Sequence, residues 1–195
     1  MKLSLRGIVF SALLAALLVL FGYVSIPLGF TPVPITLQTL AVMLAGGLLG
    51  AWYGFLSMAL VVVLTAIGFP LLHGTGGLPV LFGPTGGYVI MWPFAALLIG
   101  LLLPRIRMRG ALGYAAAFLV LEVFGSLLLY VTGVPWLAHV TGLSFEKAMI
   151  AGCYPYLLGD AIKAAVATLI ISPVRQVFPP ERLTGSSGSR VISLD

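Results

Sequence analysis

The chain has 195 residues, of which 61% are hydrophobic and only 8% are charged, and its formal net charge is +5. Soluble domains carry about 25% charged residues, so the composition excludes a soluble globular protein and indicates an integral protein of the lipid bilayer. The positive charge does not indicate binding to nucleic acid, because most basic residues cluster at expected helix ends, as in cytoplasmic flanks. Seven of the ten basic residues form these clusters: Lys2 and Arg6; Arg105, Arg107 and Arg109; Arg175 and Arg182.

Metal-binding and catalytic constellations are missing from the sequence. Cys153 is the only cysteine, so neither an intramolecular disulfide nor a cysteine-based metal site is expected. His73 and His139 stand alone, without the spacing of metal ligands. An intramembrane enzyme needs a nucleophile with its base, or a metal, and these residues supply neither. We therefore expect no enzyme, no metal and no cofactor.

The first apolar stretch, residues 7–26, is long enough to cross a bilayer. No small-residue cleavage site follows it, so we interpret it as a retained helix rather than a signal peptide. Ala12 and Ala16 form a small-xxx-small pair, with Ala15 beside them, and this spacing lets another helix approach closely. Alanine is also abundant in membrane helices generally, so an ordinary lipid-facing role is an equal alternative.

The second and third spans are expected within one long apolar run. Three prolines within residues 27–34 forbid a helix there and predict an irregular segment. The run from 36 to 68 would be about 50 Å long as one helix, against a hydrocarbon core of about 30 Å. We therefore predict two spans, 37–49 and 51–67, with the break at the glycines that end at Gly50.

Residues 69–88 form the longest uncharged connection, which is both apolar and rich in glycine. Irregular backbone at membrane depth is tolerated where it is buried in protein or lines a cavity. We therefore expect a re-entrant segment or a lid over a site. A phosphate cradle is disfavoured, because the lysine of the Walker pattern is missing.

The fourth span is expected at 88–103, and a tight basic turn, Arg105–Arg109, follows it. The fifth span, 111–130, carries Glu122 near its middle. This acid is either a second site residue or an inward-facing structural group. Residues 131–141, which contain glycine and proline, are expected to be another connection.

The last span is separated from a short outer helix that starts at Ser144. As one helix, residues 144–174 would be about 46 Å long, so Pro155 is the expected break and 156–174 the sixth span. The sequence thus predicts an all-α membrane domain of six transmembrane helices over residues 1–175, with Gly/Pro-rich outer loops. A polar, flexible tail, 176–195, is expected to follow.

Charge asymmetry predicts the orientation. With six spans and a cytoplasmic N-terminus, the Arg105–Arg109 turn and the C-terminal arginines lie on the cytoplasmic side, as the positive-inside rule requires. The Gly/Pro-rich connections then lie outside and hold no arginine. We therefore expect a multi-pass protein of the cell membrane with both termini in the cytoplasm.

Asp160 and Lys163 place two formal charges in the sixth span. They are three residues apart, so on a helix they point to the same side. A charge near the middle of a membrane helix costs about 2.5–3.5 kcal/mol on insertion scales, so such residues usually line a cavity or face a partner. The alternative, an ion pair that only holds helices together, is less favoured, because membrane helices pack at lower cost through small residues.

Three separated motifs resemble the BioY family, the biotin-specific S components of energy-coupling-factor (ECF) transporters. They are Pro34-Ile-Thr36-Leu-Gln38-Thr39, Leu81-Phe-Gly83-Pro84-Thr85-Gly86-Gly87-Tyr88 and Pro155-Tyr-Leu-Leu-Gly159-Asp160-Ala-Ile-Lys163. They occur in the family's order, the resemblance extends over about residues 7–174, and the family fold has six membrane helices. One departure is Tyr156-Leu-Leu158, where the family pattern has phenylalanine and a second proline.

The resemblance implies high-affinity binding of biotin in the outer half of the membrane, enclosed by two loops, and its uptake. Asp160 and Lys163 are expected to hydrogen-bond the ureido ring of biotin, which offers two N–H donors and a carbonyl acceptor. Thr36 could equally act only as a helix cap. The other substrate-binding residues that the resemblance implies are Gln38, Gly83, Pro84, Thr85, Gly86, Gly87 and Tyr88.

The resemblance also implies partner proteins. In S components an Ala-x-x-x-Ala pattern on the first helix docks the transmembrane coupling protein (the T component), and Ala12 and Ala16 match it. ATP hydrolysis is expected in a pair of separate ATPase subunits, because this sequence has no nucleotide-binding signature. Two alternatives stay open: an S component for another small vitamin-like solute, and a secondary carrier, for which no internal repeat is evident.

Overall fold

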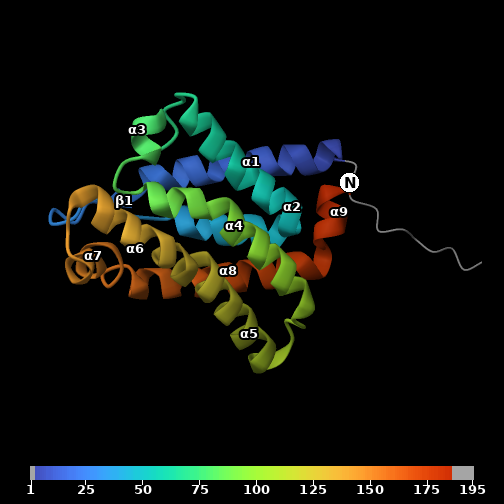
Figure 1. Cartoon of the computed structure of the whole chain (residues 1–195). Coiled ribbons are helices and arrows are strands. Elements are labelled where there is room, and N and C mark those ends of the chain that lie inside the picture. Colours follow the sequence, from blue (N-terminus) through green and yellow to red (C-terminus); the bar gives the residue numbers. More distant parts are fainter. Residues whose placement is uncertain (1–2, 186–195) are drawn as a thin grey trace, which may run out of the picture.

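Helices dominate the structure, a computed structural model in which residues 3–185 are described. Figure 1 shows the start of α1 and α9 at one end of the bundle, here the terminal end, and β1, α3 and α7 at the other, the loop end. The elements are α1 (Leu5–Tyr23), β1 (Ser25–Ile26), β2 (Ile35–Thr36), α2 (Gln38–Ala66), α3 (Leu78–Leu81), α4 (Gly86–Leu102), the 3-10 turn η1 (Leu103–Arg105), α5 (Gly110–Glu122), the π-helical turn η2 (Val123–Leu127), α6 (Leu128–Thr141), α7 (Phe145–Gly152), α8 (Leu157–Val177) and α9 (Pro180–Thr184).

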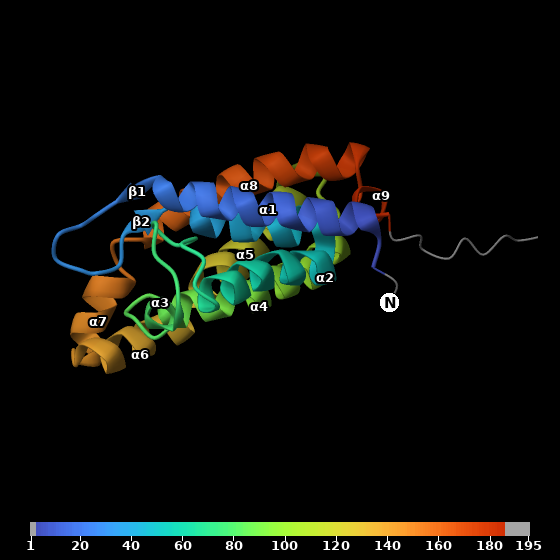
Figure 2. The ribbon, with the colours of Figure 1, turned by 90° about the horizontal axis from the view of Figure 1, so that it is seen from above.

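Within residues 3–185, five helical stretches are long and apolar enough to cross a membrane: Leu5–Tyr23, Gln38–Ala66, Gly86–Arg105, Gly110–Thr141 and Leu157–Val177. Seen from above in Figure 2, α1, α2, α4 and α8 run between the loop end and the terminal end. A helix rises about 1.5 Å per residue, so each of these stretches except Gln38–Ala66, which is kinked at Gly50, covers most or all of a hydrocarbon core about 30 Å thick.

Helix α2 contributes two membrane passes, because the chain reverses direction inside it. Gly50 has φ 77° and ψ −174°, a conformation that essentially only glycine adopts. A Cβ atom on Gly54 would lie 3.0 Å from the carbonyl oxygen of Ala45. In a straight helix these residues would be about 13 Å apart, so the two halves of α2 must fold back on each other. The predicted break lies at Gly50, and the six-pass helical fold is confirmed.

The fifth pass is longer than predicted, which corrects its expected end at Tyr130. The helix continues through η2 into α6, so residues 131–141 are helical rather than a connection. A Cβ atom on Gly133 would lie 2.3 Å from the ring of Tyr88, so α6 packs closely on α4 at this glycine. This packing outweighs the helix-breaking tendency of Gly133 and Pro135.

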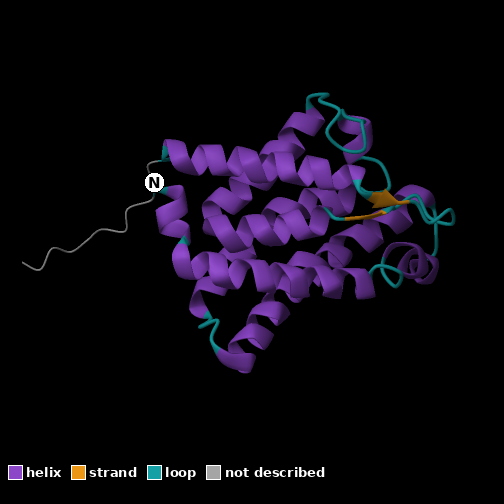
Figure 3. Cartoon of the chain, turned by 180° about the vertical axis from the view of Figure 1, so that it is seen from behind, coloured by secondary structure: helices purple, strands orange, loops and turns teal. Residues whose placement is uncertain are grey.

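The first pass ends earlier than predicted. Helix α1 stops at Tyr23 rather than at residue 26, because Ser25–Ile26 pairs with Ile35–Thr36 as two short antiparallel strands. Figure 3 shows this strand pair at the loop end. The two strands bring together the ends of the proline-rich segment 27–34 at the loop end.

The last pass extends beyond its expected end. Helix α8 continues through Pro173 to Val177, and α9 occupies part of the stretch 176–195 that the sequence predicts as a tail. Residues 186–195 of that tail, like residues 1–2, lie outside the described residues. Helix α9 packs at the terminal end, where the Ser4 hydroxyl donates a hydrogen bond to the carbonyl oxygen of Thr184.

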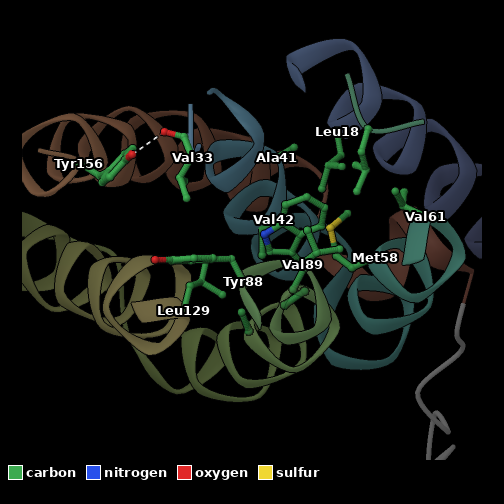
Figure 4. Close-up of a cluster of buried hydrophobic side chains, with 14 of the residues drawn as sticks. Leu18, Val33, Ala41, Val42, Met58, Val61, Tyr88, Val89, Leu129 and Tyr156 are labelled. Carbon is green, nitrogen blue, oxygen red and sulfur yellow. Dashed lines mark hydrogen bonds between the residues drawn. The ribbon is translucent and has the colours of Figure 1, made fainter. Parts of the chain in front are cut away.

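The core lies where α1, both halves of α2 and α4 meet. Leu18, Val42 and Met58 are completely buried there, beside Val61 and Val89 (Figure 4). A second buried cluster packs α8 and α5 on the other side of α2 and α4. The first half of α2 is therefore enclosed by helices on all sides, which positions its polar N-terminal residues inside the protein.

The reversal at Gly50 generates a stability prediction. Gly50→Ala should destabilise the protein by about 1–3 kcal/mol, because this backbone conformation is strained for alanine. The new Cβ atom would meet only Pro180, at 3.6 Å, so a steric clash would not cause the loss. Melting curves in detergent measure the effect. Gly159→Ala in α8, where a Cβ atom meets nothing within 4 Å, is the matched control and should not lower Tm; equal Tm values for both variants would refute the strain.

Candidate functional site

The loop end encloses a cavity of about 420 Å³ between α2, α4, α6 and α8, beneath the loops that carry β2 and α3. Small-molecule sites usually measure about 300–1,000 Å³ and have mainly apolar walls with a few polar groups. The cavity is lined by Pro32, Val33, Pro34, Thr36, Gln38, Thr39, Leu72, His73, Thr75, Pro79, Val80, Gly83, Pro84, Thr85, Tyr88, Val89, Trp92, Ser126, Leu129, Tyr130, Gly152, Tyr156, Asp160 and Lys163.

Asp160, which is only 3% exposed, is the centre of the polar part of this wall. Its carboxylate accepts hydrogen bonds from the hydroxyls of Thr39 (3.2 Å), Ser126 (2.8 Å) and Tyr130, which come from three different elements. The fourth donor is the Lys163 ammonium, 2.7 Å away. A carboxylate has about four acceptor positions, so Asp160 is fully satisfied without a ligand. Its place in the first turn of α8 also suits its negative charge.

Lys163 faces the same side of α8, as the three-residue spacing predicts. Its Nζ atom donates to Asp160 Oδ1 at 2.7 Å and to Thr39 Oγ1 at 3.1 Å. An ammonium group has three donors, so one remains for a solute. Among residues 3–185 this is the one ion pair, and both side chains are buried.

Aromatic side chains hold the loops over the cavity. The Tyr156 hydroxyl donates to the carbonyl oxygen of Val33 at 2.5 Å, which ties the proline-rich segment to the start of α8 (Figure 4). Trp136 Nε1 donates to the carbonyl oxygen of Gly83 at 2.9 Å, which ties the α3 loop to α6. Each loop therefore has at least one specific bond to the helical scaffold.

His73 belongs to the loop before α3 and lines the cavity with an unusual backbone, at φ 53°. Burial lowers the pKa of its imidazole below the ordinary value of 6.5, so the ring is neutral at pH 7. Asp160 and Lys163 are then the charged groups in the cavity wall. Because they neutralise each other, the cavity suits a polar but uncharged group at this position.

Eight of the ten predicted substrate-binding residues line the cavity: Asp160, Lys163, Thr36, Gln38, Gly83, Pro84, Thr85 and Tyr88. Gln38 Oε1 accepts a hydrogen bond from the Thr36 hydroxyl at 3.2 Å. Gln38 Nε2 is buried close to Gly22 of α1 and has no hydrogen-bond partner among residues 3–185. Thr36 Oγ1 also accepts from the backbone N–H of Gln38, but the N-cap position of α2 is Leu37 and has no side-chain cap bond, so the possible capping role of Thr36 is wrong.

Gly86 and Gly87 do not line the cavity, and their places explain why glycine is needed. A Cβ atom on Gly87 would lie 2.4 Å from Cβ of Trp136, and one on Gly86 would lie 1.7 Å from the carbonyl oxygen of Leu81. These two glycines let α4 approach α6 and the α3 loop. Their part in the site is to position the wall rather than to contact a solute.

Sequence reasoning missed Ser126 and Tyr130 as members of the site. They follow Glu122 at intervals of four residues, a spacing that places all three on one side of a helix and could have been recognised as a polar face. Glu122 itself does not line the cavity, although it is near enough to Asp160 and Lys163 to interact with them electrostatically. Its Oε2 atom is buried without a hydrogen-bond partner in the described part of the chain.

The two alanines predicted to dock a partner lie on the outer face of α1. Ala12 and Ala16 are exposed, whereas Ala15 is 6% exposed and packs into the core. Neighbouring Leu13 and Leu20 are also exposed, so this face is apolar with a shallow strip of small residues. Such a strip lets a helix of another protein, or lipid, lie close to the backbone of α1.

The fold and the cavity together define a class of protein: a multi-pass helical membrane protein with a cavity of the size of a small-molecule site between its helices. Within residues 3–185 no group of three or more His, Cys, Asp or Glu residues is placed to hold a metal ion.

The sequence profile of the BioY family matches residues 1–180, so the chain belongs to the BioY family.

Relatives match this chain over most of their length. It is 41% identical to the "Biotin transporter BioY" of Rhizobium etli over 182 residues, 91% of this chain and 97% of that protein. It is also 41% identical to the transporter of the same name from Rhodobacter capsulatus, covering 89% of this chain and 95% of the relative. A crystal structure of the S-component for biotin from an ECF-type ABC transporter matches with TM-score 0.81 at 33% identity, over 88% of this chain and 91% of that one. These relatives are transporters, and the chain is not an enzyme.

The unequal bonding of the ion pair predicts unequal effects of its removal. Asp160→Leu leaves Lys163 buried with only the Thr39 hydroxyl, and should destabilise the protein by about 3–5 kcal/mol. Lys163→Met should cost less, because Asp160 keeps three hydroxyl donors. Melting curves without ligand measure both, and the double change Asp160→Leu, Lys163→Met should recover most of the loss. Equal losses from the two single changes would contradict this account of the network.

Proposed function

We propose that this chain is the biotin-binding S component of an ECF transporter and takes up biotin across the cytoplasmic membrane. The observation that carries the proposal is the Asp160–Lys163 pair in the wall of the cavity at the loop end, in a chain of the BioY family. Relatives named as biotin transporters, and a solved S component for biotin, support the choice of solute.

The chemistry of biotin fits the donors and acceptors of the cavity. The ureido carbonyl can accept the N–H of Lys163 that Asp160 and Thr39 do not use. Asp160 already accepts four donors, so a ureido N–H must replace one of the hydroxyls rather than add a fifth bond. Binding is then an exchange of hydrogen bonds, and the ligand's N–H groups never face an unpaired buried charge.

The remaining wall suits the apolar part of biotin. Trp92, Tyr88 and Tyr156 present aromatic surface, and Leu129 and Val89 add aliphatic surface. The thiophane ring and the alkyl chain would lose contact with water against these groups. In our proposal the loops of residues 27–34 and 69–85 close over the ligand and give way during its release.

Energy for uptake would come from partner subunits. We propose that the strip of Ala12 and Ala16 on α1 docks the T component, and that a pair of ATPase subunits joined to it hydrolyses ATP. The exposure of both alanines supports this role, because helix docking needs small residues at the surface.

We propose that both termini lie in the cytoplasm and that the cavity opens toward the outside. The support is the distribution of arginine: the Arg105–Arg109 turn, Arg175 and Arg182 all lie toward the terminal end, whereas no arginine lines the cavity at the loop end. Positively charged residues favour the cytoplasmic side of membrane proteins.

Biotin binding generates the central prediction. Asp160→Asn keeps the shape of the side chain but loses a charge-assisted acceptor, and should weaken biotin binding by about one to two orders of magnitude. Lys163→Ala should be at least as damaging. Calorimetry of the purified protein with biotin measures Kd, with thiamine and riboflavin as alternative solutes. Glu146→Gln removes a carboxylate that is exposed on α7, and should bind like the parent. Tight binding of another vitamin in place of biotin would overturn the assignment of the solute.

Docking predicts a separate phenotype. Ala12→Leu with Ala16→Leu should abolish biotin uptake in cells that contain the coupling module, while the isolated protein binds biotin normally, because close helix approach is lost. Ala111→Leu with Ala115→Leu is the matched control, since these alanines have the same spacing and are exposed on α5. Co-purification of the Ala12, Ala16 double variant with the T component would show that this face is not the docking surface.

A further inference from the structure

The terminal end holds a second cavity, far from the proposed biotin site. Its volume is about 290 Å³, and it lies between the α4–α5 turn and the end of α8 with the start of α9. The wall contains three arginines, Arg107, Arg109 and Arg175, but a single carboxylate, Glu181. Three guanidinium groups around one small space favour an anionic ligand.

Arg175 is fixed in place and incompletely satisfied. Its Nε atom donates a hydrogen bond to the carbonyl oxygen of Gly47, while Nη2 is buried and has no partner among residues 3–185. Among residues 3–185 the one ion pair joins Asp160 and Lys163, so Glu181 forms no salt bridge with Arg175. A buried donor of a charged group is costly to leave unpaired, and Arg175 also lines the cavity, so an anion there would interact with the same side chain.

Neutral groups add to the positive field. Ser172 and Gln176 line the same cavity with side chains that can donate hydrogen bonds. Helix α5 begins at Gly110, directly after Arg109, and its first turn has neither an acidic residue nor a side-chain cap. The free N–H groups at the start of a helix carry partial positive charge, which also favours an anion nearby.

The depth of the cavity indicates the source of the anion. Arg175 lies in the last turn of α8, a helix of 21 residues. At about 1.5 Å per residue α8 is about 31 Å long, so its last turn reaches the headgroup layer. Ile106 and Met108 line the cavity beside the arginines and offer apolar contact to the glycerol and upper acyl chain of a lipid.

We propose that this cavity binds the phosphate of an acidic phospholipid headgroup. Arg175 is the fixed donor, and the exposed Arg107 and Arg109 close on the phosphate from the turn. A guanidinium fork matches phosphate oxygens in pairs, and basic pockets at the ends of membrane helices recognise anionic lipids in this way. Inorganic phosphate has the same chemistry, so the experiment must separate the two sources.

The test measures thermal stability of the purified full chain in detergent with three additions: phosphatidylglycerol, phosphatidylcholine, and inorganic phosphate alone. Phosphatidylglycerol should raise Tm more than phosphatidylcholine does. Arg175→Gln should weaken the apparent affinity for phosphatidylglycerol by about tenfold or more, as expected for losing a charge-assisted bond. Arg105→Gln is the matched control, because Arg105 belongs to the same basic turn but does not line the cavity. Biotin binding, at the other end, should stay intact in both variants and reports correct folding.

The possible outcomes distinguish a built lipid site from a site for free phosphate, from general attraction to charge and from a protein interface. A selective loss in Arg175→Gln, with retention in Arg105→Gln, supports the site. If inorganic phosphate raises Tm and phosphatidylglycerol does not, the anion site is supported, but a lipid is overturned as the source of the anion. Equal losses in the two variants would reveal only general attraction to charge and refute a built site. If the pair Arg107→Gln, Arg109→Gln disrupts assembly with the T component but not lipid-dependent stability, the surface is a protein interface and the proposal is wrong.

Discussion

The buried pair of Asp160 and Lys163 is the constraint on which the loop end depends. Taking two charges out of water costs several kcal/mol per ion, and their attraction offsets this only when further hydrogen bonds complete the geometry. Thr39 from α2, Ser126 from η2 and Tyr130 from α6 provide those bonds. Three separate segments of the chain, namely α2, the continuous helix of η2 and α6, and α8, therefore converge on one carboxylate. The cavity is the space that remains beside this point of convergence.

Two irregular helices make the convergence possible. Helix α2 turns back at Gly50, so its first half runs from Thr39 at the loop end to the terminal end and its second half returns. The helix formed by α5, η2 and α6 covers 32 residues, about 48 Å, and so extends past the hydrocarbon core. Its π-helical turn presents Ser126 to Asp160, and its far part carries Trp136, which holds the α3 loop.

Much of this could be read from the sequence, and the failures have a common cause. Length, charge and glycine position predicted the passes, and the spacing of Asp160 and Lys163 predicted their shared side, because these properties are local. The continuation of the helix through Gly133 and the position of Gly87 outside the cavity wall depend on how α4 packs against α6, and no local sequence pattern records that packing. The Ser126 hydroxyl is informative only once its distance to Asp160 is known.

The distribution of bonds also indicates which parts of the wall can open. The first half of α2 is joined to α8 at both ends, by Thr39 to the ion pair and by the Gly47 carbonyl to Arg175. Separating them would remove the hydrogen bonds that Thr39 and the Gly47 carbonyl make to charged groups of α8, which contribute about 1.5–3 kcal/mol each. The hydrogen bond from Tyr156 to a loop carbonyl is neutral and contributes about 0.5–1.5 kcal/mol net. The loops are therefore the parts that move at the lowest cost, while α2 and α8 keep the polar wall intact.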